Sequence, residues 1–166
     1  MVLTWTEAYV HAAREYSDEV FRANIQVPGS AQNPDYGWRL EAALQDVQDQ
    51  RIVREALDVQ VDVDGFRGPL HFRSVQPGDK LRPLGGTGTR KLSDLLGEAG
   101  LTMMARRRLP IICDIIGPIW VPGVALEERV RLAPGSKRAL RLFLRPFASL
   151  ESISETPGSA RAYANS

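Results

Sequence analysis

The most informative stretch of the chain runs Gln76-Pro-Gly-Asp-Lys-Leu-Arg-Pro-Leu-Gly-Gly-Thr-Gly-Thr-Arg-Lys-Leu-Ser-Asp-Leu-Leu96. A Pro-Gly turn leads into a basic, glycine-rich loop, and the loop opens directly into a short predicted helix. Such a loop gathers backbone N–H groups and cationic side chains in one place. The stretch therefore predicts a site for a phosphate or for an anionic polymer.

The glycines of this loop leave three interpretations open. The run from Gly85 to Lys91 has neither the spacing of a Walker A loop nor a G-x-G-x-x-G pattern between strand and helix, so it is a weak candidate for a mononucleotide site. A turn that needs positive φ explains the glycines at least as well. Contact with RNA backbone phosphates is an intermediate interpretation, because it needs a less exact arrangement of the loop than a nucleotide site does.

The composition is that of a globular protein with one domain or two small layers. The chain has 166 residues, of which 43% are apolar, enough for a real core. No apolar run reaches the roughly 18–20 residues of a membrane helix, and the first residues lack a signal-peptide pattern. The single cysteine, Cys113, excludes an internal disulfide, so we expect a cytoplasmic protein with no membrane partner. His11 and His71 are the only histidines, and we expect no metal site.

The charges are distributed unevenly along the chain. Residues 32–64 contain eight acids and three bases, whereas residues 65–145 contain fifteen bases and six acids. The difference in the second segment is 15 − 6, or nine net positive charges, enough to steer the protein toward nucleic acid. Bases spread around a solvated surface would give the same count, and composition does not decide between the two.

Periodicity predicts strands in both halves of the chain and a helical pair between them. Alternation predicts strands at 21–27, 38–44, 57–63, 66–74 and 138–145, with Asp64-Gly65 as a hairpin turn between 57–63 and 66–74. Shorter strands are expected at 111–114, 119–121 and 124–132. Helices are expected at 90–98, capped by Thr89, and at 102–108. This order indicates an α+β fold with a mixed or antiparallel sheet.

Several residues with reactive side chains are better explained as structural. Asp114 follows an apolar strand, but no second carboxylate or histidine lies nearby in the sequence, so we expect a carboxylate satisfied within its own turn. Cys113 and Trp120 are expected in the core. Glu127 and Glu128 are expected to be a solvated pair. No catalytic residue is therefore predicted.

The run from Arg67 to about Leu142 resembles the C-terminal domain of bacterial tRNA(Ile)-lysidine synthetases. The matching pieces, in order, are Pro69-Leu70-His71-Phe72-Arg73, Pro77-Gly78-Asp79-Lys80-Leu81-Arg82-Pro83-Leu84-Gly85, Arg90-Lys91-Leu92-Ser93-Asp94-Leu95-Leu96, Arg107-Arg108-Leu109-Pro110-Ile111-Ile112-Cys113-Asp114, Ile119-Trp120-Val121-Pro122-Gly123 and Glu128-Arg129. The stretch from Phe21 to Asp64 is more weakly similar to the segment that precedes that domain. The run is also similar to a mixed α/β module of the phenylalanyl-tRNA synthetase β chain.

The resemblance implies a ligase that uses ATP to adenylate the wobble cytidine of tRNA(Ile) and then attaches lysine. In that family, catalysis belongs to an N-terminal ATP-pyrophosphatase domain with a Ser-Gly-Gly-x-Asp-Ser loop, and these 166 residues contain no such loop. We therefore expect a tRNA-binding part that is inactive as a ligase alone and holds no cofactor itself. The expected segments are an amphipathic helix at 1–19, a strand-rich segment at 20–66, the family-like domain at 67–145 and a flexible tail at 146–166.

The resemblance and the basic loop together predict the residues that contact tRNA. Cations would contact phosphates and glycines would permit close backbone approach; the predicted set is Arg73, Lys80, Arg82, Gly85, Gly86, Gly88, Arg90, Lys91, Arg107 and Arg108. A second hypothesis is a docking module that binds a separate catalytic subunit or its own copy as a homodimer. A third, a small enzyme in its own right, is opposed by the missing loop and the scarcity of His and Cys.

Overall fold

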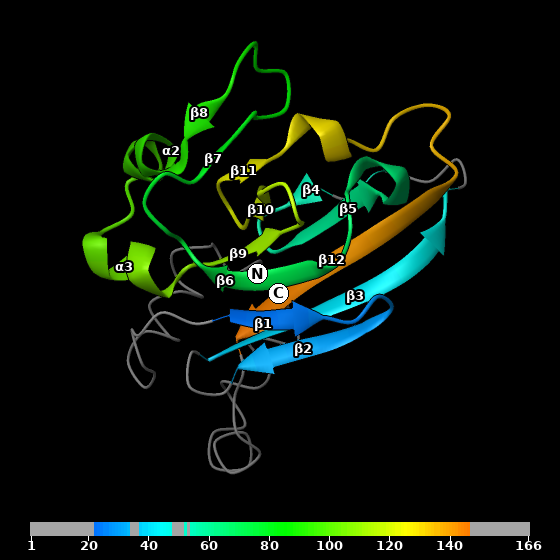
Figure 1. Cartoon of the computed structure of the whole chain (residues 1–166), viewed down its shortest axis with the longest axis horizontal. Coiled ribbons are helices and arrows are strands. Elements are labelled where there is room, and N and C mark those ends of the chain that lie inside the picture. The colour runs from blue at the N-terminus through cyan, green and yellow to red at the C-terminus, as the bar shows by residue number, and fades with distance from the viewer. Residues whose placement is uncertain (1–21, 34–36, 48–51, 53, 147–166) are drawn as a thin grey trace.

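The computed structural model describes residues 22–33, 37–47, 52 and 54–146. The helix expected at 1–19 and the tail expected after residue 146 lie outside them. Two five-stranded sheets pack against each other, and two short helices with a two-stranded ribbon lie at one end of the molecule (Figure 1). All strand pairs in the described part of the chain are antiparallel. The predicted α+β fold is confirmed.

Sheet B, in the order β2-β3-β12-β5-β4, is built on the two longest strands. β3 and β12 pair from Arg138 opposite Asp46 to Pro146 opposite Trp38. Both were predicted from alternation, and the alternation is the cause, because it gives each strand one apolar face to bury. The strands of this sheet are β2 (Gly29–Asn33), β3 (Trp38–Asp46), β12 (Arg138–Pro146), β5 (Asp58–Asp62) and β4 (Arg54–Glu55).

Sheet A, in the order β1-β6-β9-β10-β11, is made of shorter strands. All four residues of β9 and all four of β10 are buried, which explains why their sequences are continuous apolar runs rather than alternating ones. The strands of this sheet are β1 (Arg22–Ile25), β6 (Leu70–Ser74), β9 (Pro110–Cys113), β10 (Pro118–Val121) and β11 (Ala125–Leu126).

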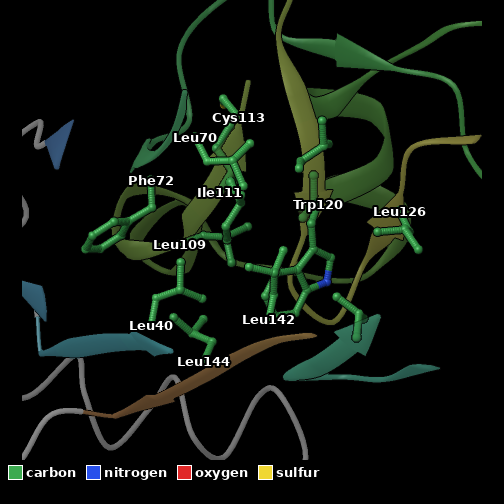
Figure 2. Close-up of a cluster of buried hydrophobic side chains, with 14 of the residues drawn as sticks. Leu40, Leu70, Phe72, Leu109, Ile111, Cys113, Trp120, Leu126, Leu142 and Leu144 are labelled. Atoms are coloured by element: carbon green, nitrogen blue, oxygen red, sulfur yellow. The ribbon is translucent and has the colours of Figure 1, made fainter. Parts of the chain in front are cut away.

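One apolar core lies between the two sheets. Leu142 and Leu144 of sheet B point toward Trp120 and Ile111 of sheet A (Figure 2), and all four are at most 2% exposed. Trp120 is therefore a core residue, as predicted. Cys113 is also buried, and burial raises the pKa of its thiol to about 12, so it is an inert core side chain.

The helical pair lies where the sequence predicts it, with one difference at its start. β7 (Lys80–Leu81) and β8 (Arg90–Lys91) form the ribbon, α2 (Leu92–Glu98) follows at once, and α3 (Met103–Arg108) comes next. Thr102 caps α3 by accepting a hydrogen bond from the Ala105 amide. Thr89 does not cap α2: Lys91 occupies the cap position, because residues 90 and 91 are extended.

Two expected elements are wrong, and one strand was missed. Asp64-Gly65 is not a hairpin turn, because residues 63–65 form the 3-10 turn η1 (Val63–Gly65) and the strands on either side of it, β5 and β6, belong to different sheets. The predicted strand at 124–132 is only the two-residue β11 followed by the 3-10 turn η2 (Glu128–Val130). β2 was not predicted, since Gly-Ser-Ala-Gln-Asn has too little apolar alternation.

No helix in the described residues is long and apolar enough to span a membrane.

Candidate nucleic-acid interface

Two lysines face each other across the β7–β8 ribbon. Lys80 pairs directly with Lys91, and Leu81 with Arg90. Leu81 is buried, whereas both lysines are exposed. Within the described ranges, no carboxylate forms a salt bridge with either lysine. Directly opposed like charges destabilise a strand pair, and a bound anion would relieve that repulsion.

A buried ion pair holds the ribbon in place. Asp79, just before β7, accepts two hydrogen bonds from Arg73 at 2.8 Å each, and both side chains are about 10% exposed. Asp79 also accepts from the Gln76 amide at 2.7 Å, and its carbonyl accepts from the Leu92 amide at the start of α2. The hydrogen bond from Arg73 to Asp79 raises the pKa of Arg73 further. Arg73, predicted to contact phosphate, thus points inward and positions the ribbon instead.

The glycine-rich loop is closed by two carboxylates. Glu127 accepts from the Arg82 amide at 2.6 Å, and Glu128 accepts from the Gly85 amide at 3.0 Å. The Gly85 amide, followed by Arg131 at 3.1 Å, lowers the pKa of Glu128. The solvated acidic pair expected from the sequence is therefore wrong, because these acids shape the loop.

This arrangement does not fit a nucleotide phosphate. A phosphate at the loop amides would have to displace the carboxylates of Glu127 and Glu128 and would be repelled by them. Gly85 has φ +73°, so its glycine is explained by the turn. Gly88 differs, because a Cβ built there meets nothing within 4 Å and its φ is not positive. Neither the turn nor packing explains a glycine at position 88, so the sequence prediction of close backbone approach stays a prediction.

The three arginines that end α3 have different environments. Arg106 donates from Nε to the Leu101 carbonyl at 3.1 Å and so ties α3 to the connection that precedes it. Arg107 is exposed. Arg108 is half-buried, its Nε and Nη1 groups are buried without a hydrogen-bond partner, and its carbonyl accepts from Trp38 Nε1 at 3.2 Å.

The predicted cations therefore fall into two groups. Arg73 is bound to Asp79, and Arg90 forms a bidentate ion pair with Glu98 on α2. Arg107 presents an exposed side chain. The other four form no ion pair with a carboxylate of the described residues; they are Lys80, Arg82, Lys91 and Arg108. The two helices and the ribbon, whose sequences carry these cations, form one end of the molecule (Figure 1).

Residues 70–142 match the family model described as the TilS substrate C-terminal domain. A crystal structure of a TilS C-terminal domain superimposes with a TM-score of 0.69 and 26% identity, covering 79% of this chain and all of that one. The chain carries a TilS C-terminal domain. Both the ribbon and α3 lie within the matched residues.

Relatives of this TilS C-terminal domain are tRNA(Ile)-lysidine synthases. The protein of Symbiobacterium thermophilum is 32% identical over 121 residues, which are 73% of this chain and 25% of that protein. The protein of Bacteroides thetaiotaomicron is 30% identical over 92 residues, 55% of this chain and 22% of its own length. A bifunctional protein TilS/HprT of Listeria monocytogenes is 37% identical over 79 residues. This chain spans about a quarter or less of the length of these relatives.

Sequence reasoning missed the acidic residues that build this site in the TilS C-terminal domain. Asp79, Glu127 and Glu128 bind backbone amides of the loop and ribbon, and the last two lie more than forty positions from their partners. Local spacing carries no signal for such contacts. The role of Asp79 could have been predicted more easily, since an acid after Pro77-Gly78 commonly accepts hydrogen bonds from the amides of its own turn.

Proposed function

We propose that this TilS C-terminal domain holds a tRNA by its phosphate backbone for a tRNA(Ile)-lysidine synthetase reaction. The observation that carries the proposal is the exposed Lys80–Lys91 pair, which is fixed on a short ribbon and has no carboxylate partner among the described residues. Cross-strand neighbours lie about 5 Å apart at their Cβ atoms, so two ammonium groups can approach one phosphate or two successive ones. The ribbon is pre-organised by the Arg73–Asp79 pair, which reduces the entropy lost on binding.

Arg82, Arg107 and Arg108 extend this contact along one side of the fold. Arg82 donates from Nε to the Gly86 carbonyl at 3.1 Å, and its side chain is otherwise exposed. Arginine forms bidentate pairs with phosphate, whereas lysine acts as a point charge. Such contacts set affinity and register but carry little sequence information, so any choice of tRNA identity lies elsewhere.

In this proposal the ligase chemistry belongs to the larger remaining part of such a synthetase. Adenylation of the wobble cytidine with ATP, and its replacement by lysine, would take place in that part, in the cytoplasm. The loop at Gly85 would not bind the ATP, because Glu128 occupies its amide. The role of this chain's residues is to bind and orient the RNA.

Binding to a tRNA(Ile) transcript at about 50 and 200 mM salt tests the proposal. Lys80→Ala/Lys91→Ala removes two phosphate contacts, so the slope of log K against log salt should become shallower by about 1.4–1.8. The matched control is Lys137→Ala/Arg138→Ala, which removes two exposed cations at the start of β12. The control should leave the slope unchanged. Absence of binding at low salt, or equal slopes for the two double variants, would refute the proposal.

A further inference from the structure

Polar side chains gather on the outer face of sheet A, where β1 pairs with β6. Arg22 lies opposite Arg73, and Asn24 lies opposite His71. Phe72, between the two β6 residues, is completely buried and points toward sheet B (Figure 2). Because side chains alternate along a strand, His71 and Arg73 point the other way, and the register places Arg22 and Asn24 beside them. We call Arg22, Asn24 and His71 the β1–β6 patch.

The β1–β6 patch carries a positive charge that no carboxylate of the described residues neutralises. Arg73, next to the patch, is balanced by Asp79 through two hydrogen bonds of 2.8 Å. Arg22 is exposed and forms no salt bridge within the same part of the chain. Asn24 is also exposed, and neither its amide nor the imidazole of His71 makes a side-chain hydrogen bond with the described residues. One guanidinium and two neutral groups with N–H donors are thus available to a ligand.

The half-buried imidazole of His71 responds to the charges around it. Burial, followed by the positive charges of Arg22 and Arg73, lowers the pKa of His71, and Asp114, just after β9, opposes them more weakly. Cys113, its neighbour on β9, stays neutral because burial raises the pKa of the thiol to about 12. The imidazole is therefore mostly neutral at pH 7 in the free domain. An anion beside it would favour the protonated form.

Arg73 connects the β1–β6 patch to the β7–β8 ribbon. It lies opposite Arg22 in the sheet, and its guanidinium binds Asp79, which comes directly before Lys80 of the ribbon. Cross-strand neighbours lie about 5 Å apart at their Cβ atoms, so little more than one ion pair separates Arg22 from the start of the ribbon. An RNA backbone, with a phosphate at every nucleotide, could contact both places at once. A single free phosphate could not.

We propose that Arg22, Asn24 and His71 bind a further backbone phosphate of the RNA and that His71 takes up a proton as they do so. The inference rests on the proposed function, which supplies the RNA. Arg22 offers a charged, forked donor, Asn24 an amide NH₂, and the protonated imidazole a charge-assisted hydrogen bond. The proton comes from the solvent and returns to it when the RNA leaves. RNA affinity must therefore rise as pH falls through the range in which the imidazole titrates.

The affinity of the full chain for RNA between about pH 6 and pH 8 tests this inference. The ligand is a tRNA(Ile) transcript with a 5′-hydroxyl end, so that no terminal phosphate titrates in this range. Wild type should bind roughly threefold or more tightly at pH 6 than at pH 8. His71→Gln keeps a hydrogen-bonding side chain that cannot be protonated, so it should match wild type at pH 8 and bind more weakly at pH 6. A variant that had merely lost its fold would bind weakly at both.

Arg22→Ala gives a readout that does not depend on protons. It removes one phosphate contact, so the slope of log K against log salt should become shallower by about 0.7–0.9. Arg22→Lys keeps the charge and should retain most of the slope. The matched control is Arg138→Ala, which removes an exposed cation at the start of β12 and should leave the slope unchanged. In NMR titrations of wild type, the pKa of His71 should rise when the RNA is added.

These measurements separate the inference from the proposed function. It is overturned, with tRNA binding intact, if wild-type affinity is the same at pH 6 and pH 8 or if Arg22→Ala keeps the full salt slope. A pH dependence that survives in His71→Gln, or that disappears in His11→Gln instead, also overturns it. Lys80→Ala/Lys91→Ala should weaken binding at both pH values and keep the pH dependence. If wild type binds no tRNA at either pH, the proposed function fails, and this inference fails with it.

Discussion

Replacing Asp114 by asparagine should destabilise the fold more than the same kind of substitution at an exposed carboxylate. The substitution keeps the shape of the side chain and an oxygen that can still accept from Ile116 and Gly117. It removes the charge that pairs with Arg129 and replaces the oxygen that accepts from the Arg67 amide. The NH₂ group of asparagine at that position would face two other donors, the Arg67 amide and Arg129 Nη1.

The size of the loss can be derived from the contacts. Removing one partner of a buried ion pair typically costs about 3–5 kcal/mol, because the other charge is left uncompensated. Arg129 is 27% exposed and can be partly rehydrated, so the lower end of that range applies. We therefore expect Asp114→Asn to lower the free energy of unfolding by about 3 kcal/mol. For a domain of this size, that corresponds to a fall in Tm of roughly 10 °C.

The pH dependence gives a second, independent readout. Burial alone would raise the pKa of Asp114, but hydrogen bonds from Arg129 and from the amides of Arg67, Gly117 and Ile116 outweigh it and hold the pKa below the ordinary 3.8. A carboxyl with a lowered folded-state pKa stabilises fully above its unfolded pKa and loses that contribution as pH falls through the folded one. The difference between wild type and variant should therefore be constant near neutral pH and shrink below about pH 4.

Urea denaturation of both proteins between about pH 7 and pH 3 measures both quantities. Asp94→Asn, at an exposed carboxylate on α2, is the control and should change stability by less than about 0.5 kcal/mol. A loss below about 1 kcal/mol for Asp114→Asn, or a difference from wild type that does not shrink at acid pH, would refute the reasoning.

Three further predictions use other parts of the fold. Lys80→Glu should stabilise the domain by roughly 0.5 kcal/mol, because it puts an opposite charge across from Lys91, yet weaken tRNA binding; thermal melts and a binding titration check this. Gly65→Ala should cost about 1–3 kcal/mol in denaturant titrations, since its Cβ would lie 2.4 Å from a carbonyl oxygen of η2, whereas Gly88→Ala should be neutral. Cys113, with its pKa raised to about 12 by burial, should react with a thiol reagent at about pH 8 only after unfolding in guanidinium chloride.

The elements that could be predicted are those whose signal is local. β3 and β12 alternate clearly, and α3 has a threonine cap and a following proline. The wrong predictions concern elements whose identity depends on distant partners. Asp64-Gly65 has the composition of a hairpin turn, but β5 already pairs with β12 on one side and β4 on the other, so β6 joins sheet A instead. β2 is a strand because it pairs with β3 along five positions, not because of its own sequence.

The candidate site divides in the same way. Lys80, Lys91 and the arginines of α3 could be named as cationic candidates, because their charge and turn context are visible in the chain. Which of these cations form ion pairs within the domain could not be predicted. Arg73 and Arg90 look no different from their neighbours in the sequence, and only the fold pairs them with Asp79 and Glu98.

Local sequence patterns were enough to predict the fold class, the main core strands, the helical pair, the core positions of Cys113 and Trp120, and the cationic character of one stretch. Periodicity and composition are enough for these, since each depends on neighbours along the chain. The tertiary structure alone decided that the glycine-rich loop is closed by Glu127 and Glu128 and that Lys80 faces Lys91. These contacts arise between segments that meet only after folding, when backbone amides and charges are satisfied by partners far away in sequence.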